Sequence, residues 1–424
     1  MIFLFLLYDF IFFLGWVLYL PFYARRKKIN LQAFREKFTL YPAPRIKNAI
    51  WIQVVSVGEV NVIARLIHRL KEIFEYPIVI TTTTLTGNSL AKKKYSQYAT
   101  ILFFPFDLSL VIERFLKRIK PKIFIAVETE IWPNLFYRLG TKHVPIAIIN
   151  GRISDKAYIR YKKVKPVIKW MLNKCSYIGV QDNYYKQKFL SLGCQQHRIK
   201  VSGNMKFESI TVNEEQLLRY KHKYSGKLKE ENRLLIVAGS THYQEEKFIL
   251  NIYKELIDAG KDISLLIAPR HIDRIAALER QIAASGLIPV RISNFEPTPK
   301  NEKNIFLLDT IGELIYFYSL SDICFVGGTL SDYGGHNILE PIYFLKPTIF
   351  GPHMDNFKDV EGVILTKGAA LKVRDSASLG EILTQLIDDE ALRNNLRLKC
   401  LDVFEEERKG LEENLRIILQ CMQE

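Results

Sequence analysis

Short apolar runs alternate with helical patterns along most of the chain, and this alternation constrains the fold more than any other feature. The runs are rich in Val, Ile and Phe. Continuous runs of this kind indicate strands buried on both faces, as in a parallel sheet covered by helices. The predicted strands are residues 50–55, 77–82, 101–104, 122–127, 145–149 and 177–180, followed by 234–238, 263–268, 305–308, 323–326 and 347–350.

The alternation pauses once, in a polar and highly charged stretch at residues 207–232. A chain of 424 residues is also too long for one ordinary hydrophobic core. We therefore predict an α/β protein with two doubly wound Rossmann-like domains facing a cleft, at residues 25–206 and 233–424. The last helix has the length to pack back on the N-terminal domain. In such sheets ligands bind beyond the carboxyl ends of the strands.

The N-terminal segment is a candidate membrane anchor. Residues 1–23 are apolar and aromatic except for Asp9, and the basic cluster Arg25, Arg26, Lys27 and Lys28 follows. About 20 apolar residues span a bilayer, and a basic flank keeps the following chain in the cytoplasm. We predict an anchor over residues 1–24. Asp9 would cost about 2.5–3.5 kcal/mol at the centre of a span, so a single span and an insertion into one leaflet both fit.

The composition favours an anionic partner. The chain carries 60 Lys and Arg against 45 Asp and Glu, a formal charge of +15. No nucleic-acid-binding motif accompanies this charge, so anionic lipids and phosphorylated substrates are favoured over nucleic acid. The five cysteines form no CxxC pair, which disfavours a zinc site and a disulfide framework.

The run GGHNILEP at residues 334–341 is the clearest local signal of function. It follows a predicted strand and leads into a helical pattern at residues 337–344. Glycines let a ligand approach the backbone, and a helix N-terminus offers N–H groups to a phosphate. Glu340 lies one helical turn after Asn337 and could accept hydrogen bonds from a ribose. The run indicates a nucleotide-sugar site, and a glycine-rich turn without a ligand is the alternative.

Charged side chains also follow other predicted strands. Glu59 lies in the first turn after the first strand, where it either serves chemistry or complements the helix dipole. Glu128 and Glu130 follow the fourth strand, and Lys206 lies near the expected hinge. A metal at the acidic pair is disfavoured because alternate residues of a strand face different ways. The chain contains no GxGxxG, Walker A, GxSxG or HExxH motif, which argues against dehydrogenases, NTPases, serine hydrolases and metalloproteases.

Taken together, these motifs resemble the 3-deoxy-D-manno-octulosonic acid (Kdo) transferases of lipopolysaccharide biosynthesis. The resemblance rests on VSVGE at 55–59, ETEIWPN at 128–134, GNMKF at 203–207, DTIGEL at 309–314 and GGHNILEP. It implies a glycosyltransferase-B fold, the donor CMP-Kdo and a tetraacylated lipid A precursor (lipid IVA) as acceptor. It further implies the cytoplasmic face of the inner membrane, with its anionic lipids, and no cofactor or metal. One departure is Ile338, where the family commonly has proline.

The resemblance also implies roles for single residues. Glu59 matches the proton acceptor of the family, and Glu128 and Lys206 match positions credited with transition-state stabilisation. The segments that match the CMP-binding residues are Pro269 and Arg270, then Ile311, Gly312 and Glu313, then Asn337, Ile338, Leu339 and Glu340.

Two other functions stay open at this point. One is a different nucleotide-sugar enzyme of the same fold, either an epimerase or another glycosyltransferase. The membrane anchor and the runs VSVGE and ETEIWPN disfavour a soluble epimerase. The other is a non-catalytic, membrane-anchored protein that binds acidic glycolipid. Release of CMP from CMP-Kdo in the presence of acceptor distinguishes an enzyme from a binding protein.

Overall fold

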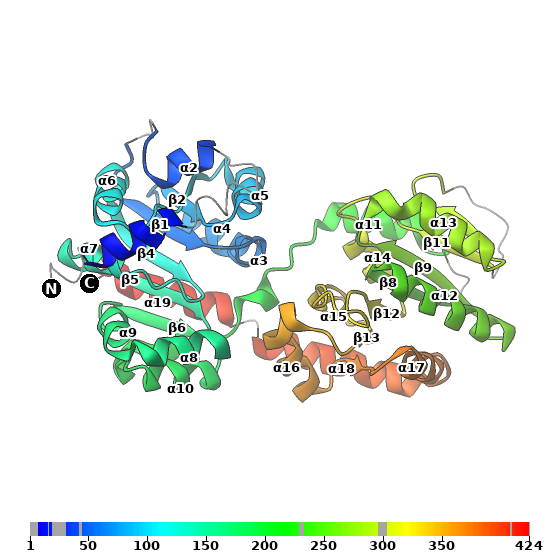
Figure 1. Ribbon diagram of the computed structural model, residues 1–424. Coiled ribbons are helices and arrows are strands. Elements are labelled where there is room, and N and C mark those ends of the chain that lie inside the picture. Colours follow the sequence, from blue (N-terminus) through cyan, green and yellow to red (C-terminus); the bar gives the residue numbers. More distant parts are fainter. Residues whose placement is uncertain are drawn as a thin grey trace. The chain divides into compact units, whose positions relative to one another are not determined.

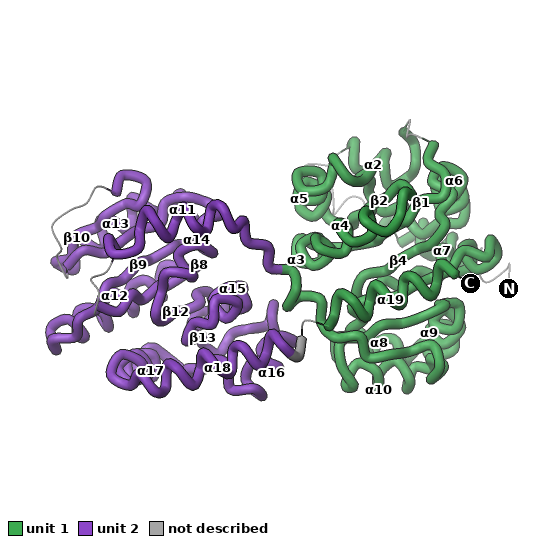
Figure 2. The backbone as a smooth tube through the Cα atoms, turned by 180° about the vertical axis from the view of Figure 1, so that it is seen from behind, with its two compact units in different colours: residues 1–209, 407–424 green, residues 210–406 purple. Residues whose placement is uncertain are grey.

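The chain forms two compact units in a computed structural model (Figures 1 and 2). The structure describes residues 7–15, 17–18, 31–41, 45–228, 233–295, 303–407 and 409–423. Unit 1 comprises residues 1–209 and 407–424, and unit 2 comprises residues 210–406.

Unit 1 contains a seven-stranded sheet in its described part, and all of the strand pairs are parallel. The strand order is β3-β2-β1-β4-β5-β6-β7. Its strands are β1 (Ala49–Val54), β2 (Ile78–Thr82), β3 (Ala99–Phe103), β4 (Pro121–Val127), β5 (Ile146–Gly151), β6 (Tyr177–Val180) and β7 (Ile199–Val201). Its helices are α2 (Leu31–Lys37), α3 (Val57–Val62), α4 (Ala64–Ile73), α5 (Leu85–Tyr95), α6 (Ser109–Ile119), α7 (Pro133–Thr141), α8 (Asp155–Lys163), α9 (Lys165–Leu172), α10 (Asn183–Ser191) and α19 (Gly410–Gln423), with 3-10 turns η1 (Gln196–Arg198) and η2 (Met205–Glu208).

Helices cover both faces of this sheet, which is why its strands are continuously apolar. Trp51 and Phe124 of β1 and β4 pack with α6, α7, α9 and α10. Their strand neighbours Ile52 and Ile125 face the opposite way and pack with α3, α4, α5 and α19. The doubly wound arrangement predicted from the sequence is confirmed, and both faces of the sheet are closed to ligands.

Unit 2 repeats this architecture with strand order β10-β11-β9-β8-β12-β13-β14, again parallel throughout the described residues. Its strands are β8 (Leu234–Thr241), β9 (Ile263–Pro269), β10 (Ile288–Arg291), β11 (Asn304–Leu307), β12 (Ile323–Val326), β13 (Thr348–Phe350) and β14 (Leu371–Lys372). Its helices are α11 (Glu214–Tyr224), α12 (Tyr243–Asp258), α13 (Ile275–Ala284), α14 (Leu314–Leu320), α15 (Leu339–Tyr343), α16 (Lys358–Lys367), α17 (Ser376–Asp388) and α18 (Glu390–Glu407), with 3-10 turns η3 (Ile272–Arg274) and η4 (Asp355–Phe357).

The two units divide between residues 209 and 210, within the stretch predicted as a connection at 207–232. The helix α11 in that stretch belongs to unit 2, because Tyr220 stacks on Tyr316 at 4.8 Å and Tyr224 packs on Phe317 at 5.2 Å. The boundary therefore lies just after η2, and most of the charged stretch contributes to the second unit.

The predicted anchor lies only partly within the described residues. Residues 7–15 and 17–18 are helical, whereas residues 1–6, 16, 19–30 and the basic cluster among them lie outside the description. Over the described part of the chain, no helix is both long and apolar enough to cross a membrane.

The C-terminal helix α19 is part of unit 1 and is held there by a buried asparagine. Asn414 Oδ1 accepts hydrogen bonds from Asn150 N at 3.1 Å and from Ser202 Oγ at 2.9 Å. Its Nδ2 donates to Gly410 O at 2.7 Å, and the side chain is fully buried. This amide connects the last helix to the carboxyl ends of two strands.

Replacing this amide should destabilise unit 1. Asn414→Leu leaves the buried N–H of Asn150 without this acceptor, at a cost of about 1–3 kcal/mol. The Ser202 hydroxyl loses the better of its two acceptors and keeps Val180 O at 3.3 Å. Tryptophan fluorescence during urea unfolding measures this, since all four tryptophans belong to unit 1. Glu412→Ala, at an exposed position of the same helix, is the control and should stay within about 0.5 kcal/mol. Equal stability of the two variants would show that the Asn414 contacts contribute little.

Candidate functional site

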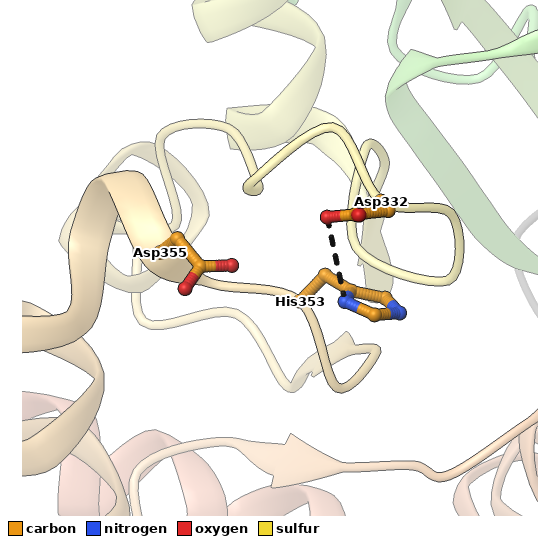
Figure 3. Close-up of side chains that lie close together, drawn as sticks. All are labelled: Asp332, His353 and Asp355. Atoms are coloured by element: carbon orange, nitrogen blue, oxygen red, sulfur yellow. Dashed lines mark ion pairs between the residues drawn. The ribbon is translucent and has the colours of Figure 1, made fainter.

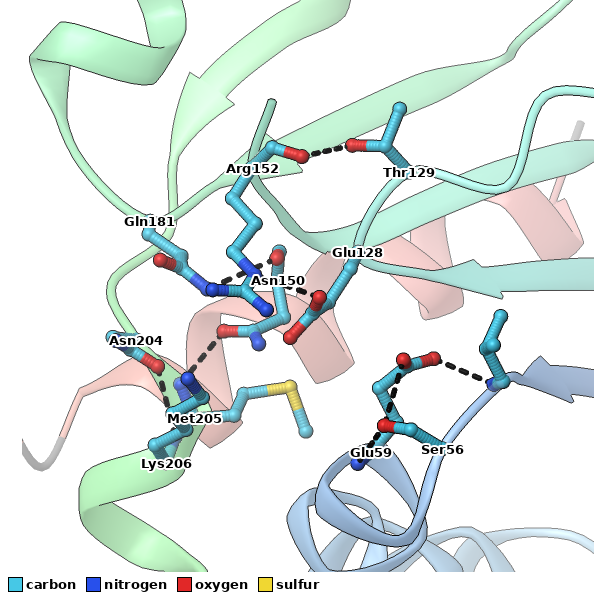
Figure 4. Close-up of polar contacts among 11 residues, drawn as sticks. Ser56, Glu59, Glu128, Thr129, Asn150, Arg152, Gln181, Asn204, Met205 and Lys206 are labelled. Atoms are coloured by element: carbon cyan, nitrogen blue, oxygen red, sulfur yellow. Dashed lines mark hydrogen bonds and ion pairs between the residues drawn. The ribbon is translucent and has the colours of Figure 1, made fainter. Parts of the chain in front are cut away.

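The strand order of unit 1 reverses between β1 and β4, the position where doubly wound sheets bind ligands. Glu59 lies just beyond β1, and Glu128 and Glu130 lie just beyond β4. The structure brings these three carboxylates together, because each contributes to the electrostatic environment of another. Figure 4 shows Glu59 and Glu128 facing each other across the ends of the two strands.

Glu59 is held at the N-terminus of α3 by its own carboxylate. Its Oε2 accepts a hydrogen bond from Val55 N at 2.7 Å, and its Oε1 accepts one from Ser56 Oγ at 3.1 Å. Burial, with a further contribution from Glu128, raises the pKa of Glu59 to about 8, although the bond from Val55 opposes the shift. The residue therefore caps its helix and also has a basicity suited to proton transfer near neutral pH.

Glu128 is fixed by an ion pair and by an unusual backbone conformation. Arg152 Nε donates to Glu128 Oε2 at 2.7 Å. The φ of Glu128 is +64°, in the left-handed region that side chains other than glycine rarely adopt. Such conformations concentrate at functional sites, where surrounding structure holds them. The partner Arg152 was not predicted, although it lies in the run NGR directly after the fifth strand.

Glu130 joins the cluster, and the reason given for separating it from Glu128 was wrong. Glu128 and Glu130 are two positions apart, and residues at that spacing line the same face of a strand. Both also lie beyond β4, which ends at Val127. Trp132 Nε1 donates to Glu130 Oε2 at 3.0 Å. Burial raises the pKa of Glu130 to about 7, and Glu128 adds to the increase.

Asn150 ties this cluster to the turn that carries Lys206. Its Oδ1 accepts from Met205 N at 2.9 Å, and its backbone carbonyl accepts from Gln181 Nε2 at 3.3 Å. The bond to Met205 fixes the orientation of the amide, so Nδ2 is the atom that hydrogen-bonds to no described protein atom. This buried donor lies at a strand end, where a substrate oxygen could accept its hydrogen bond.

In unit 2, the predicted nucleotide-binding residues lie beyond the carboxyl ends of β9, β11 and β12, with β8 between β9 and β12. Pro269 is the last residue of β9, and the exposed Arg270 follows, with its N–H bonded to Thr241 O at 2.9 Å. Ile311 is 87% exposed, and Gly312 has a φ of +87° on the loop after β11. Glu313 accepts a hydrogen bond from Thr310 Oγ1 in the same loop.

The helix that follows the glycines of the run GGHNILEP is shorter than predicted. The helix α15 begins at Leu339, two residues later than the predicted start, and Asn337 Oδ1 accepts from Leu339 N at 3.2 Å. Asn337 Nδ2 donates to Glu340 Oε1 at 3.0 Å. Burial raises the pKa of Glu340 to about 7, opposed by that bond and by the charge of Arg270. The structure thus brings Arg270, Asn337 and Glu340 together.

The glycines of this turn serve internal packing, which corrects the reason given for them. A Cβ on Gly334 would lie 2.7 Å from Asn356 Nδ2, and one on Gly335 would lie 2.6 Å from Met354 Sδ. Both glycines also have positive φ. The backbone that a ligand was expected to approach here is already covered by the loop after β13.

Sequence reasoning did not predict the contacts within a group of rings beside these residues. His242 and His336 share a hydrogen bond of 2.9 Å between their Nε2 atoms, and Tyr333 stacks on His242 at 3.8 Å. Burial lowers the pKa of each histidine to about 4. The signal was present in the sequence, since His242 follows β8 and His336 lies inside GGHNILEP. The two histidine rings and the tyrosine thus pack together, and the charge of Arg270 contributes to lowering the pKa of both histidines.

One group of three potential metal ligands occurs among the described residues. Ligand atoms of Asp332, His353 and Asp355 lie within 4.8 Å of one another (Figure 3). Both aspartates are exposed, and His353 Nδ1 lies 3.8 Å from Asp332 Oδ1. Exposed acidic groups of this kind are common without an ion, and none of the three residues was predicted to act.

Two doubly wound units with polar residues at their strand ends define the glycosyltransferase-B class of fold. A glycosyltransferase of Rickettsia africae has this fold, with a TM-score of 0.54 and 16% identity over 89% of this chain and 99% of that one. UDP-GlcNAc 2-epimerase of Neisseria meningitidis is similar, with a TM-score of 0.53 and 14% identity over 89% of this chain and 100% of that one. At these identities the likeness concerns the fold alone.

The sequence defines the family within that class. Residues 32–209 match the family described as 3-deoxy-D-manno-octulosonic-acid transferase. A 3-deoxy-D-manno-octulosonic acid transferase of Haemophilus influenzae is 31% identical, over 91% of each chain. The protein belongs to the Kdo transferase family and is a glycosyltransferase, which confirms the resemblance seen in the motifs.

A further relative is longer than this chain. The bifunctional glycosyltransferase/methyltransferase of Fusobacterium nucleatum is 39% identical over 329 residues, 77% of this chain. The match spans half of that relative's length.

The raised pKa of Glu59 predicts a pH-dependent stability. Between an ordinary pKa of 4.5 and about 8, the folded state binds more protons than the unfolded state, so stability falls as pH rises. Glu59→Gln removes this loss. The free energy of unfolding of this variant should equal that of the parent near pH 5. Near pH 9 it should exceed the parent value by at least about 1.4 kcal/mol, the equivalent of one pKa unit. Urea unfolding followed by tryptophan fluorescence gives both values. An equal difference at both pH values would mean that Glu59 titrates normally.

Proposed function

We propose that this glycosyltransferase moves Kdo from CMP-Kdo to a tetraacylated lipid A precursor, lipid IVA, at the cytoplasmic face of the inner membrane. The observation that carries the proposal is Glu59, a buried carboxylate with a pKa of about 8 beside Glu128 at the switch point of the sheet. Family membership supports the sugar that is transferred. The basic composition, with a formal charge of +15, suits a phosphorylated glycolipid and an anionic membrane surface.

The proposed reaction is one displacement at the anomeric carbon of Kdo. The acceptor hydroxyl oxygen forms the new bond to that carbon, and the bond from the carbon to the CMP phosphate oxygen breaks. Glu59 takes the hydroxyl proton as a general base. CMP leaves with the bonding electrons, and attack from the opposite face inverts the anomeric configuration.

The roles proposed for the other residues follow from their charge and position. Lys206 in unit 1 and Arg270 in unit 2 offset the negative charge of donor and leaving group. Glu128, held by Arg152 at 2.7 Å, raises the basicity of Glu59 and stabilises charge that develops on the reacting sugar. Asn337 and Glu340 hold the nucleotide, with Pro269, Ile311, Gly312, Glu313, Ile338 and Leu339 shaping its site. The proposal includes no metal or cofactor.

Loss of the Glu59 carboxylate should reduce turnover. Glu59→Ala is expected to lower kcat by at least about 10²-fold, within the range for a general base. CMP binding should be unchanged, because the residue belongs to unit 1. Release of CMP from CMP-Kdo with detergent-dispersed acceptor, in excess EDTA, measures the rate.

The matched control is Asp375→Ala, which removes a carboxylate that caps helix α17 by accepting from Ser378 N at 2.9 Å. It should leave kcat unchanged. If both variants lost activity equally, Glu59 would serve only as a helix cap. Activity that EDTA abolishes and magnesium restores would contradict the metal-independent reaction.

Nucleotide affinity should depend on the charged residues of unit 2. A charge-assisted hydrogen bond contributes about 1.5–3 kcal/mol, so Arg270→Ala and Glu340→Ala should each weaken CMP binding roughly 10- to 150-fold. Isothermal titration calorimetry measures this. Arg291→Ala is the control, since this arginine of unit 2 pairs with Glu279 at 2.6 Å instead. Unchanged affinity in both test variants would place the donor elsewhere.

A further inference from the structure

The hydrogen-bonded pair His242 and His336 lies among the predicted nucleotide-binding residues of unit 2. His242 is the N-cap residue of α12 after β8, and His336 directly precedes Asn337 in the run GGHNILEP. The charge of Arg270 acts on His242, on His336 and on Glu340, so all of these side chains share one electrostatic environment. The pair is therefore part of the same strand-end region as the residues expected to hold the nucleotide.

Gly328 makes room for the ring of His336. A Cβ on Gly328 would lie 2.7 Å from His336 Cδ2 and 2.8 Å from His336 Nε2. The φ of this glycine is +70°, and its N–H donates to the buried Glu245 Oε2 at 2.8 Å. The edge of the His336 ring that carries Cδ2 and Nε2 thus packs on a fixed glycine, and Nδ1 lies on the opposite edge.

The hydrogen bond between the two rings constrains where their protons lie. His242 Nε2 and His336 Nε2 are 2.9 Å apart, so one of these nitrogens donates and the other accepts. Burial, with contributions from Arg270 and His271, lowers the pKa of both histidines to about 4, so both rings are neutral near pH 7. A neutral imidazole carries one proton. The ring that accepts at Nε2 therefore carries its proton on Nδ1.

Burial distinguishes the two rings. His242 is 6% exposed, and Tyr333 stacks on it at 3.8 Å. His336 is only half-buried, and His242 is the one hydrogen-bond partner of its ring among the described residues. Of the two Nδ1 atoms, that of His336 is therefore the better placed to meet a ligand.

Charge indicates the kind of ligand. Arg270 and Arg274 add to the effect of burial that lowers the pKa of His242, which places both guanidinium groups near this ring. Arg274 is held there by the fully buried Glu246, with its Nη2 2.9 Å from Glu246 Oε2. A neutral N–H donor beside two cationic side chains suits an oxyanion, which accepts hydrogen bonds and is attracted by both charges.

We propose that His336 Nδ1 donates a hydrogen bond to an oxyanion of the sugar donor, while His242 Nε2 donates to His336 Nε2 and so fixes the tautomer of that ring. The inference rests on the proposed function and names a contact within its donor site. CMP-Kdo carries two oxyanions, the phosphate of CMP and the carboxylate of the sugar. The same N–H group suits either of them, and the experiments distinguish the two.

The first experiment measures binding of CMP and of cytidine to the full chain by isothermal titration calorimetry, without acceptor. His336→Gln keeps an amide near the position of Nε2 and removes the donor at Nδ1. Affinity for CMP should fall roughly 10- to 150-fold, the range for a hydrogen bond to a charged group. Cytidine has no phosphate and should bind as it does to the parent. The control is His222→Gln, at an exposed residue of α11, which should bind CMP like the parent.

The KM for CMP-Kdo tests the second oxyanion. If His336→Gln binds CMP like the parent but raises this KM by a similar factor, the bound group is the carboxylate of the sugar. Parent values for both quantities would overturn the proposal, as would an equal loss of cytidine affinity, which indicates a distorted site. If the parent binds neither CMP nor CMP-Kdo, the proposed function fails. Inorganic phosphate then replaces CMP as the probe, with the same variants and the same expected order.

The second experiment separates a direct contact from packing of the ring pair. His336→Asn places a side-chain N–H near the position of Nδ1 and loses the bond to His242, which is the reverse of His336→Gln. The Asn variant should therefore retain more affinity than the Gln variant for the ligand identified above. The opposite order would show that His336 serves only to hold His242, and it would contradict the proposal.

The third experiment tests His242 as a positioning residue. His242→Phe keeps a ring that can stack on Tyr333 but has no donor, and it should weaken binding of the same ligand roughly 2- to 10-fold, the range for a neutral hydrogen bond. His242→Gln keeps a donor and should restore the parent affinity. Equal affinity of the parent and both variants would mean that His242 does not set the tautomer of His336.

Discussion

Parallel strand pairing with helices on both faces is the constraint on which the rest of this structure depends. Residues Ile50, Trp51 and Ile52 alternate between two separate cores, and each is fully buried. No side chain in the middle of such a strand can meet a ligand. Chemistry is therefore confined to the strand ends, and the parallel direction brings the carboxyl ends of all strands to one edge.

The strand ends are also where the backbone departs from ordinary conformations. Glu128, Asn150 and Ser240 have φ values of +64°, +52° and +57°, and they lie at or beyond the ends of β4, β5 and β8. At Asn150 the pairing of β5 with β6 shifts register as well. Arg152 holds Glu128 by a part-buried hydrogen bond, and buried hydrogen bonds with Met205 and Asn414 hold Asn150. The fold thus stabilises locally unfavourable conformations where polar groups must converge.

The sequence predicted the inner strands well, because burial on both faces leaves a continuous apolar run. It missed β7, β10 and β14, which are short, partly exposed strands at the sheet edges. Edge strands pair on one side only and need less apolar character. A continuous apolar run is therefore a weak signal for an edge strand.

The candidate site was predictable in its positions and much less so in its contacts. A strand end and a carboxylate are both recognised from a few consecutive residues. The sequence therefore placed Glu59, Glu128 and Arg270 at the carboxyl ends of their strands. The pairing of Glu128 with Arg152, or of His242 with His336, joins residues that are 24 and 94 positions apart. A single sequence does not show which side chains that are far apart in the chain form hydrogen bonds in the folded protein. The packing of Gly334 and Gly335 was not predicted for a related reason. The residues that crowd these glycines follow β13 and are distant in the sequence pattern.

Glu245 and Glu59 show why a raised pKa alone does not identify a functional carboxylate. Both are buried near the switch point of their sheets, and burial raises the pKa of each. Glu245 accepts hydrogen bonds from the backbone N–H groups of His242, Gly328, Thr329 and Leu330, two on each oxygen. A carboxylate offers about four lone-pair sites, so Glu245 has none left for a substrate and its role is to join α12 to the glycine turn after β12. Glu59 accepts from Val55 N and Ser56 Oγ alone among the described contacts. The remaining lone pairs of Glu59, beside a second carboxylate, suit the general base proposed for the reaction.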